Sequence, residues 1–288
     1  MASEHKVPLM KMDVLRARGT HLTVRRQMGS SRLIFNMPIA DFDLGEFADR
    51  YLPVRASSNY RERRNKIGYL WMGKLGKLLP FESMLERTVL LHMDRDPNVK
   101  RVWTQPFRLD GLDPERGNRY HRPTPDMLVE YRDERLEVVE VKPARRLEKP
   151  QLDSFDGDVE KYERATSNWL SIMRSFDFQQ REYAVHGWEL TTRSELSKAE
   201  RANLEYLSLY RRPLHRDDTL KDEILDAASA PMRLTDLADT VAGGFISAMP
   251  VILHLVWHRE LEMDMDTKIG SSTVVYNPKP TSALKAAA

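Results

Sequence analysis

The chain has 288 residues, of which 31% are charged and 41% are hydrophobic, and it contains no cysteine. This length predicts about two domains with a sizeable buried core, and the composition excludes a disordered or collagen-like chain. The absence of cysteine excludes a disulfide framework, a thiolate zinc site, an iron–sulfur cluster and a cysteine nucleophile.

Neither a secretory signal nor a membrane span is predicted. The first ten residues contain Glu4, His5 and Lys6 and lack the apolar stretch of a signal peptide. The longest uncharged stretch, residues 240–258, is interrupted by glycine, proline and histidine, so it predicts a turn followed by a buried helix. We therefore expect a cytoplasmic protein that does not contact membranes.

The net charge is only +2, but the charge is unevenly distributed. Residues 1–77 contain 15 basic and 7 acidic residues, whereas residues 213–270 contain 5 basic and 11 acidic residues. DNA would be attracted to the first region and repelled by the second, which indicates a protein partner for the C-terminal part. Charge alone fits a solvated surface equally well. The residues that we expect to contact DNA are Arg61, Arg63, Arg64, Lys66, Lys74 and Lys77.

The chain from its start to residue 141 shows one helix and several strands. Residues 1–56 have no clear apolar period, and we interpret them as an N-terminal extension. Apolar residues at steps of three and four after Pro80 predict a helix that ends before Pro97 and carries Glu82 and Glu86 on nearly one face. Residues 99–109 are typical of a strand broken at Pro106. Two β-prone runs follow and predict a hairpin, at residues 127–131 and 136–141.

The remaining chain predicts a second, mostly helical part. A helix over residues 159–173 and a strand over residues 183–191 complete an intermixed α/β arrangement. Ser197 and Glu200 have the spacing of a capping box that opens a helix ending near Tyr210. Three further helices and an edge strand predict a winged-helix domain, at residues 219–228, 234–241, 247–259 and 261–266. The tail after Asn277 is expected to be disordered.

Four charged residues suit the chemistry of phosphodiester hydrolysis: Glu86, Asp126, Glu140 and Lys142. Magnesium prefers oxygen ligands and can withdraw charge from a phosphate while activating water. A hairpin loop with an odd number of residues would place Asp126 opposite Glu140, and the period of two places Lys142 beside Glu140. Two like charges about 4 Å apart repel by ~4 kcal/mol, which a bound metal ion would relieve. The same alternation also fits the wet face of a sheet.

The order of the motifs resembles the TnsA family, the endonuclease subunit of heteromeric cut-and-paste transposases. This family belongs to the restriction-endonuclease-like PD-(D/E)xK superfamily. The resemblance covers residues 57–192 and extends more loosely to about residue 276. The motifs that carry it are Phe81-Glu82-Ser83-Met84-Leu85-Glu86, Asp96-Pro97-Asn98-Val99, Gln105-Pro106, Thr124-Pro125-Asp126-Met127-Leu128-Val129 and Val139-Glu140-Val141-Lys142-Pro143.

The resemblance implies a site and a cofactor. By position, Glu86, Asp126 and Glu140 would hold Mg²⁺, for which Mn²⁺ could substitute, and Lys142 would be the catalytic lysine. Glu140 occupies a position that is glutamine in some members of the family. Glu82 and Gln105 are candidate auxiliary residues.

The resemblance also implies a domain organisation and partners. We expect an extension at residues 1–56, a PD-(D/E)xK endonuclease domain with a mixed central sheet flanked by helices at 57–193, a winged-helix domain at 194–276 and a tail at 277–288. The expected function is metal-dependent cleavage at the 5′ ends of a transposon, as part of DNA recombination. The expected partners are double-stranded DNA, a TnsB-like transposase and, through the C-terminal domain, a TnsC-like AAA+ ATPase. Two alternatives stay open: a restriction or repair nuclease with the same core, and a non-cleaving factor that bridges DNA and an ATPase.

Overall fold

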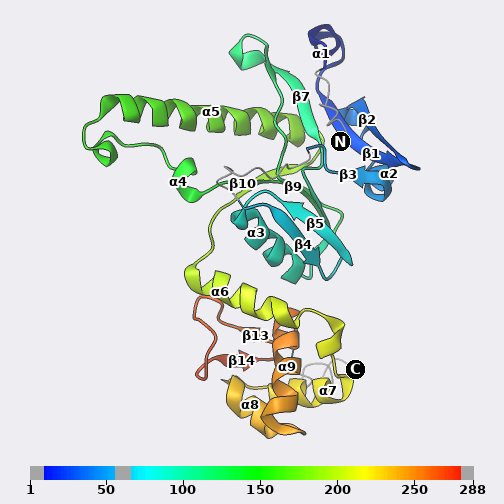
Figure 1. Ribbon diagram of the computed structural model, residues 1–288, viewed down its shortest axis with the longest axis vertical. Helices are drawn as coiled ribbons and strands as arrows, with labels where there is room; N and C mark the ends of the chain where they lie inside the picture. Colours follow the sequence, from blue (N-terminus) through cyan, green and yellow to red (C-terminus); the bar gives the residue numbers. More distant parts are fainter. Residues whose placement is uncertain (1–9, 56–65, 280–288) are drawn as a thin grey trace. The chain divides into compact units, whose positions relative to one another are not determined.

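The computed structural model describes residues 10–55 and 66–279, and the chain divides into two compact units. The first unit comprises the described parts of Met1–Tyr69 together with Leu79–Glu86 and Lys100–Ser194. The second unit comprises Leu70–Leu78, Arg87–Val99 and the described part of Glu195–Ala288. Across the described residues the fold is mixed α/β, with several sheets and nine α-helices (Figure 1). None of the helices in these ranges is long and apolar enough to cross a membrane.

The N-terminal residues form regular elements that the sequence pattern does not predict: α1 (Met12–Arg18), β1 (His21–Met28), β2 (Ser31–Pro38), α2 (Leu44–Arg50) and β3 (Tyr51–Leu52). Strands β1 and β2 form an antiparallel hairpin, and β1 also pairs with β3 and with β7 (Arg108–Asp113). The sequence of β1 does not alternate between apolar and polar residues, because side chains on both faces of this strand are buried. Leu22 and Val24 lie in the core, and Thr23 is buried where its hydroxyl donates to Asp110, 2.5 Å away.

The central sheet of the first unit carries the predicted hairpin. Its strand order is β11–β10–β9–β6, with β10 antiparallel to β9 and parallel to β11. The register of β9 and β10 runs from Leu136 opposite Glu130 to Val139 opposite Met127. The bounds are β6 (Val99–Thr104), β9 (Met127–Tyr131), β10 (Leu136–Val141) and β11 (Glu189–Arg193). The predicted hairpin is therefore confirmed. Residues 132–135 join the two strands, and because the Tyr131 amide donates to the Arg135 carbonyl at 3.0 Å, the paired register closes over the three residues 132–134.

Figure 1 shows the long helix α5 (Val159–Ala184). Its Phe178 and Tyr183 pack into a core that includes Leu128 and Val138 of the hairpin. The predicted helix over 159–173 is thus too short, and the predicted strand over 183–191 is wrong in its first part. The helix includes Tyr183 because its ring is buried there and stacks on Trp188, with ring centroids 5.9 Å apart. Strand β11 begins only at Glu189, after a turn at Gly187 with φ +71°.

The core of the first unit joins N-terminal and central elements. Phe47 of α2 packs against Trp103 of β6, with ring centroids 5.7 Å apart, and Leu22 and Val24 of β1 belong to the same cluster. Residues 10–55 are therefore an integral part of this unit. The remaining elements between residues 68 and 147 are β4 (Gly68–Met72), β5 (Lys77–Phe81), α3 (Met84–Arg95), β8 (Arg119–His121) and α4 (Ala144–Leu147).

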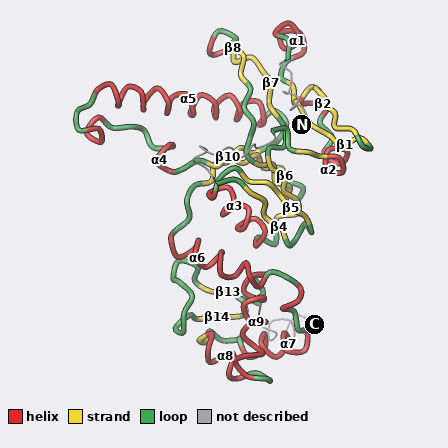
Figure 2. Tube along the Cα trace, viewed as in Figure 1, coloured by secondary structure: helices red, strands yellow, loops and turns green. Residues whose placement is uncertain are grey.

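The C-terminal part of the chain contains four helices and a small antiparallel sheet (Figure 2). The helices are α6 (Lys198–Leu207), α7 (Asp218–Ala227), α8 (Leu234–Thr240) and α9 (Gly244–Trp257), and the strands are β12 (Met232–Arg233), β13 (Glu262–Met263) and β14 (Val274–Tyr276). The predicted helices are confirmed to within a few residues. Ser197 caps α6 by accepting from the Glu200 amide, 3.0 Å away.

The predicted strand over 261–266 is shorter than expected. Only Glu262 and Met263 pair with β14. The chain then turns, because the Asp264 carboxylate accepts hydrogen bonds from the Asp266 amide at 2.9 Å and the Thr267 hydroxyl at 2.6 Å. The predicted disordered tail falls mostly on residues 280–288, which lie outside the described residues.

Candidate active site

Asp126, Glu140 and Lys142 meet at the open end of the β9–β10 hairpin. Continuing the hairpin register places Asp126 opposite Glu140, and the Val141 amide donates to Asp126 Oδ2 at 2.8 Å. The Lys142 ammonium lies 3.1 Å from Asp126 Oδ2 and 2.6 Å from Glu140 Oε2. Both carboxylates are buried. The structure thus brings together three of the four predicted residues through direct hydrogen bonds.

A buried glutamine of α5 holds the second oxygen of Glu140. Gln179 Nε2 donates to Glu140 Oε1 at 3.1 Å, and the Tyr183 hydroxyl lies 3.3 Å from Gln179 Oε1. Gln179 is fully buried. Sequence reasoning missed Gln179. Its place beside Phe178, on the apolar side of a helical pattern, was the only indication that it would be buried.

The fourth predicted residue, Glu86, has both oxygens bound at the start of α3. Oε2 accepts from the Glu82 amide at 2.8 Å, and Oε1 accepts from the Ser83 hydroxyl at 3.0 Å. Ser83 Oγ in turn accepts from the Glu86 amide at 3.1 Å. This reciprocal arrangement is a capping box, which stabilises a helix N-terminus. The Ser-x-x-Glu spacing that predicts the cap of α6 is also present here.

Burial and neighbouring charges perturb the acid–base properties of this cluster. Burial, with a further contribution from the Asp126 charge, raises the pKa of Glu86 from 4.5 to about 7. Burial also raises the pKa of Glu140, although the Lys142 ammonium opposes this. For Lys142, burial alone would lower the pKa, but the charges of Glu140 and Asp126 raise it above its usual value. The cluster has one cation for three carboxyl groups, which favours binding of a further cation.

The donor chemistry of the cluster fits Mg²⁺ through two carboxylates. In the described part of the chain, no group of three or more histidine, aspartate or glutamate side chains is arranged to hold a metal ion. The structure therefore does not bring Glu86 to Asp126 and Glu140 as a third ligand. Mg²⁺ usually binds one or two carboxylates and takes its other ligands from water and substrate phosphates. Asp126 and Glu140 meet this requirement.

Both predicted auxiliary residues adjoin the cluster. Glu82 forms an ion pair with Arg55, at 2.6 Å between Arg55 Nη2 and Glu82 Oε2. Gln105 is 1% exposed, and its backbone amide donates to the Asp126 carbonyl at 2.9 Å. It has φ +46°, a left-handed conformation that is uncommon for a residue with a side chain. The Val54 amide donates to the Gln105 carbonyl at 3.0 Å and fixes this conformation from the other side.

Three of the six predicted DNA-binding residues lie in the described part of the chain, and they belong to different units. Lys66 is exposed and belongs to the first unit. Lys74 and Lys77 belong to the second unit, where the Lys74 ammonium donates to the carbonyls of Met93, at 3.0 Å, and Asp96. These bonds satisfy carbonyls at the C-terminal end of α3 and give Lys74 a structural role. The other three predicted residues, Arg61, Arg63 and Arg64, lie outside the described residues.

A comparison with protein families identifies the central part of the chain. Residues 96–194 match the family model described as TnsA-like endonuclease N terminal. The match includes Asp126, Glu140 and Lys142. It begins at residue 96, so Glu86 lies before it. The resemblance that the motifs indicate is thereby confirmed over this range. A search of curated proteins finds no match to the chain.

Proposed function

We propose that this chain, whose residues 96–194 match the model of the TnsA-like endonuclease N terminal, is a metal-dependent DNA endonuclease that cuts the 5′ ends of a transposon. The observation that carries the proposal is the meeting of Asp126, Glu140 and Lys142 inside the matched residues, with the lysine ammonium bonded to both carboxylates. The mixed sheet beneath them fits the restriction-endonuclease-like core that this function requires.

Each residue of the cluster has a proposed role. Asp126 and Glu140 would hold the metal ion, and Glu86 is the candidate for a further ligand. Mg²⁺, or Mn²⁺ in its place, would withdraw charge from the phosphate and lower the pKa of a bound water. Lys142 positions the attacking water or a phosphate oxygen by donating from its ammonium group. Gln179 keeps Glu140 oriented through its bond to Oε1.

The second unit is proposed to bind protein. Helices α7, α8 and α9 with the β12–β14–β13 sheet have the composition of a winged-helix domain. Because residues 213–270 carry more acidic than basic residues, a TnsC-like AAA+ ATPase is a better partner for them than DNA. A TnsB-like transposase would cut and join the 3′ ends.

A strand-resolved cleavage assay tests the proposal. Asp126→Ala and Lys142→Ala would each be purified and assembled with the co-subunits on transposon-end DNA. We expect loss of the 5′ cut with the 3′ cut retained. A variant that still makes the 5′ cut at the wild-type rate would refute the assignment, and efficient cleavage without the co-subunits would favour a restriction or repair nuclease.

A further inference from the structure

A positively charged pocket lies in the first unit, next to the candidate active site. Its cavity volume is about 480 Å³, and its walls include Arg25 of β1, Arg32 of β2 and Arg55 after β3. Tyr69 and Phe81 add two aromatic rings. Among the described residues, the lining contains three arginines and no carboxylate. Arg25 and Arg32 come from the N-terminal hairpin, which lies outside the family match over residues 96–194.

Two of these arginines have uncompensated charges. In the hairpin register Arg32 lies opposite Gln27, two residues from Arg25, so both arginines share one face of the β1–β2 pair. Within residues 10–55 and 66–279, neither Arg25 nor Arg32 forms an ion pair. Arg55 differs, because its guanidinium binds Glu82. The pocket therefore attracts an anion at the hairpin side.

Gln105 gives the pocket a polar group that lacks a partner. It lines the cavity, and both polar atoms of its carboxamide are buried without a hydrogen-bond partner in the described structure. Leaving such a group unsatisfied is unfavourable, because it has lost its hydrogen bonds to water. The backbone at φ +46° is also strained, and strain of this kind is common at functional sites. Gln105 offers one acceptor and one donor group, so its ligand should offer both as well.

The pocket is connected to the active site by direct bonds. The Gln105 amide donates to the carbonyl of Asp126, at 2.9 Å. On the other side, Arg55 binds the carboxylate of Glu82, whose amide donates to Glu86. A ligand in this pocket would therefore lie beside the residues proposed to cut DNA.

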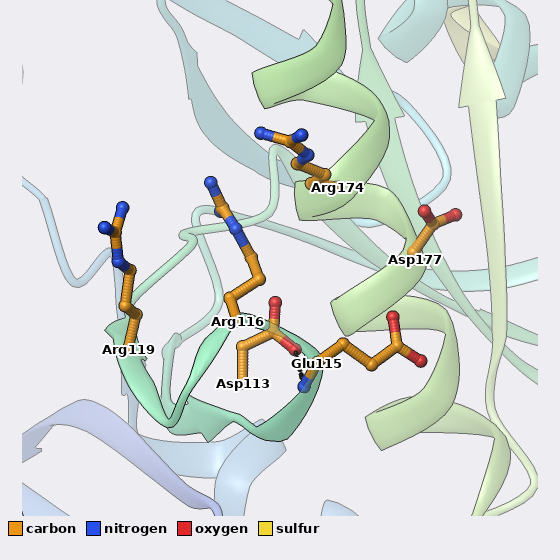
Figure 3. Close-up of a pocket in the computed structure, with 6 residues that line it drawn as sticks. All are labelled: Asp113, Glu115, Arg116, Arg119, Arg174 and Asp177. Atoms are coloured by element: carbon orange, nitrogen blue, oxygen red, sulfur yellow. Dashed lines mark hydrogen bonds between the residues drawn. The ribbon is translucent and has the colours of Figure 1, made fainter.

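A second pocket of the same unit, drawn in Figure 3, has both basic and acidic residues in its lining. It is lined by Arg116, Arg119 and Arg174, but also by three acidic residues. Two of these, Asp113 and Glu115, bind Arg181 at 3.0 and 2.8 Å. With Arg181 counted, four basic residues lie with three acidic ones here, a surplus of one positive charge. At the first pocket three arginines lie with Glu82 alone, a surplus of two, so the pocket of Figure 3 attracts a polyanion less strongly.

We infer that the pocket of Arg25, Arg32 and Gln105 binds one unpaired nucleotide of the DNA strand, beside the phosphate that is cut. The inference rests on the proposed endonuclease function. The arginines bind the phosphate of this nucleotide, and the Gln105 carboxamide pairs with the edge of its base, as glutamine does with base edges elsewhere. Tyr69, which is 71% exposed, provides a surface on which a base stacks. A cavity of about 480 Å³ that opens beside this ring suits a single extruded base better than a duplex.

The test measures DNA binding without cleavage. Full-length protein is titrated in EDTA into a fluorescein-labelled 20-nucleotide single strand and a 20-base-pair duplex, and anisotropy is followed at several KCl concentrations. We expect Arg25→Gln/Arg32→Gln to weaken single-strand binding by about tenfold or more. The salt slope should fall by about 0.7, because both arginines bind the same phosphate and each neutralised phosphate of a single strand contributes about 0.7. Gln105→Leu should weaken single-strand binding about fivefold, within the range for one base contact, and leave duplex binding unchanged.

The matched control is Arg116→Gln/Arg119→Gln, which removes the same charge from the pocket of Figure 3. It should keep wild-type affinity. Wild-type binding and salt slope in Arg25→Gln/Arg32→Gln, or an equal loss in the control, would overturn the inference, as would wild-type single-strand binding by Gln105→Leu. Arg25→Lys/Arg32→Lys should retain binding, which separates loss of charge from loss of folding. Because Asp126→Ala is expected to bind DNA without cutting it, failure of this inference and failure of the proposed function give different results.

Discussion

Both ends of the β9–β10 hairpin bury carboxylates, but the carboxylates at the two ends have different numbers of cationic partners. At the loop end, Glu130 binds two cations, Lys100 at 2.7 Å and Arg101. At the open end, Asp126 and Glu140 share the single ammonium of Lys142. All four carboxylates are buried: Glu130 and Glu137 at the loop end are 3% and 1% exposed, and Asp126 and Glu140 at the open end are 7% and 5% exposed. Burial alone therefore does not distinguish a catalytic carboxylate from a structural one.

The balance of charge does distinguish them. Burial alone would raise the pKa of Glu130, but its hydrogen bonds with Arg101 and Lys100 bring the pKa below the usual value. Glu137, also at the loop end, is bound by Arg193 at 2.7 Å and by the hydroxyls of Tyr131 and Thr191. At the open end the shift has the opposite sign, with the pKa values of Glu86 and Glu140 raised. A surplus of buried negative charge marks the end that can take up a metal ion.

The largest expected effect comes from exchanging one carboxylate for an amide at each end. Asp126→Asn should lower the rate of 5′ cleavage by about 1000-fold, because the metal-binding charge is lost. Glu130→Gln should cut DNA at the wild-type rate, although its two cations lose their partner and stability falls by about 1–3 kcal/mol. Strand-resolved cleavage and urea denaturation of both variants measure the difference. Equal cleavage rates in the two variants would remove the distinction between the two ends.

The second-largest effect is expected from removing one cation at each end of the hairpin. Lys142→Met leaves Asp126 and Glu140 buried without their ammonium and should lower stability at pH 8 by about 3 kcal/mol. Arg101→Met leaves Glu130 with Lys100, and because Arg101 is about one-third exposed the loss should be about 1 kcal/mol. Urea denaturation in EDTA measures both. If Arg101→Met were the more damaging change, the open end would not depend on its single cation.

The arrangement at the open end could be predicted largely from the sequence. Alternation along residues 136–141 places Lys142 beside Glu140, and an odd loop would place Asp126 opposite Glu140. These are local rules of strand pairing, which need no knowledge of the rest of the fold. The sequence left the loop length open, and the structure supplies the register that brings the two carboxylates together. The family resemblance then identified which of several carboxylates on these strands to select.

Other features depend on contacts that local patterns do not contain. The β1–β2 hairpin is buried on both faces by distant elements, so its sequence shows no simple alternation. Gln179 reaches Glu140 only because α5 continues eleven residues beyond its predicted end. The cap at Glu86 is predictable from the sequence, because Ser83 and Glu86 have the same spacing as Ser197 and Glu200, which predict the cap of α6.

A pH titration of Glu86→Gln sharpens the comparison further. A carboxyl whose pKa rises from 4.5 to about 7 on folding destabilises the protein when ionised, so the cost is absent below pH 4.5, grows through pH 7 and is complete above it. The shift corresponds to about 3 kcal/mol, from which the lost cap subtracts about 1 kcal/mol. Glu86→Gln should therefore be about 2 kcal/mol more stable than wild type at pH 8, and slightly less stable at pH 4.5.

The control for this titration is Glu130→Gln, because the pKa of Glu130 is lowered on folding. Its ionised form stabilises the protein above the usual pKa, so the variant should be less stable than wild type at pH 8. Thermal melts of both variants between pH 4.5 and 8 measure the stability of each variant relative to wild type. This difference should rise with pH for Glu86→Gln and fall with pH for Glu130→Gln. The same pH dependence in both variants would mean that the two ends do not differ in charge balance.

The smallest effect is the most direct test of which end binds an ion. A divalent ion that binds only the folded protein stabilises it by about 1.4 kcal/mol at ten times its Kd. Mn²⁺ should therefore raise the melting temperature of the wild type and of Glu130→Gln, and leave Asp126→Asn unchanged. The loop end should not contribute, because its carboxylates are already neutralised by arginine and lysine and would have to lose those partners to bind an ion. At the open end the ion adds positive charge where one ammonium serves three carboxyl groups, so binding also relieves the repulsion that raises the pKa of Glu86. A Mn²⁺ shift that persists in Asp126→Asn but disappears in Glu130→Gln would place the ion at the wrong end of the hairpin.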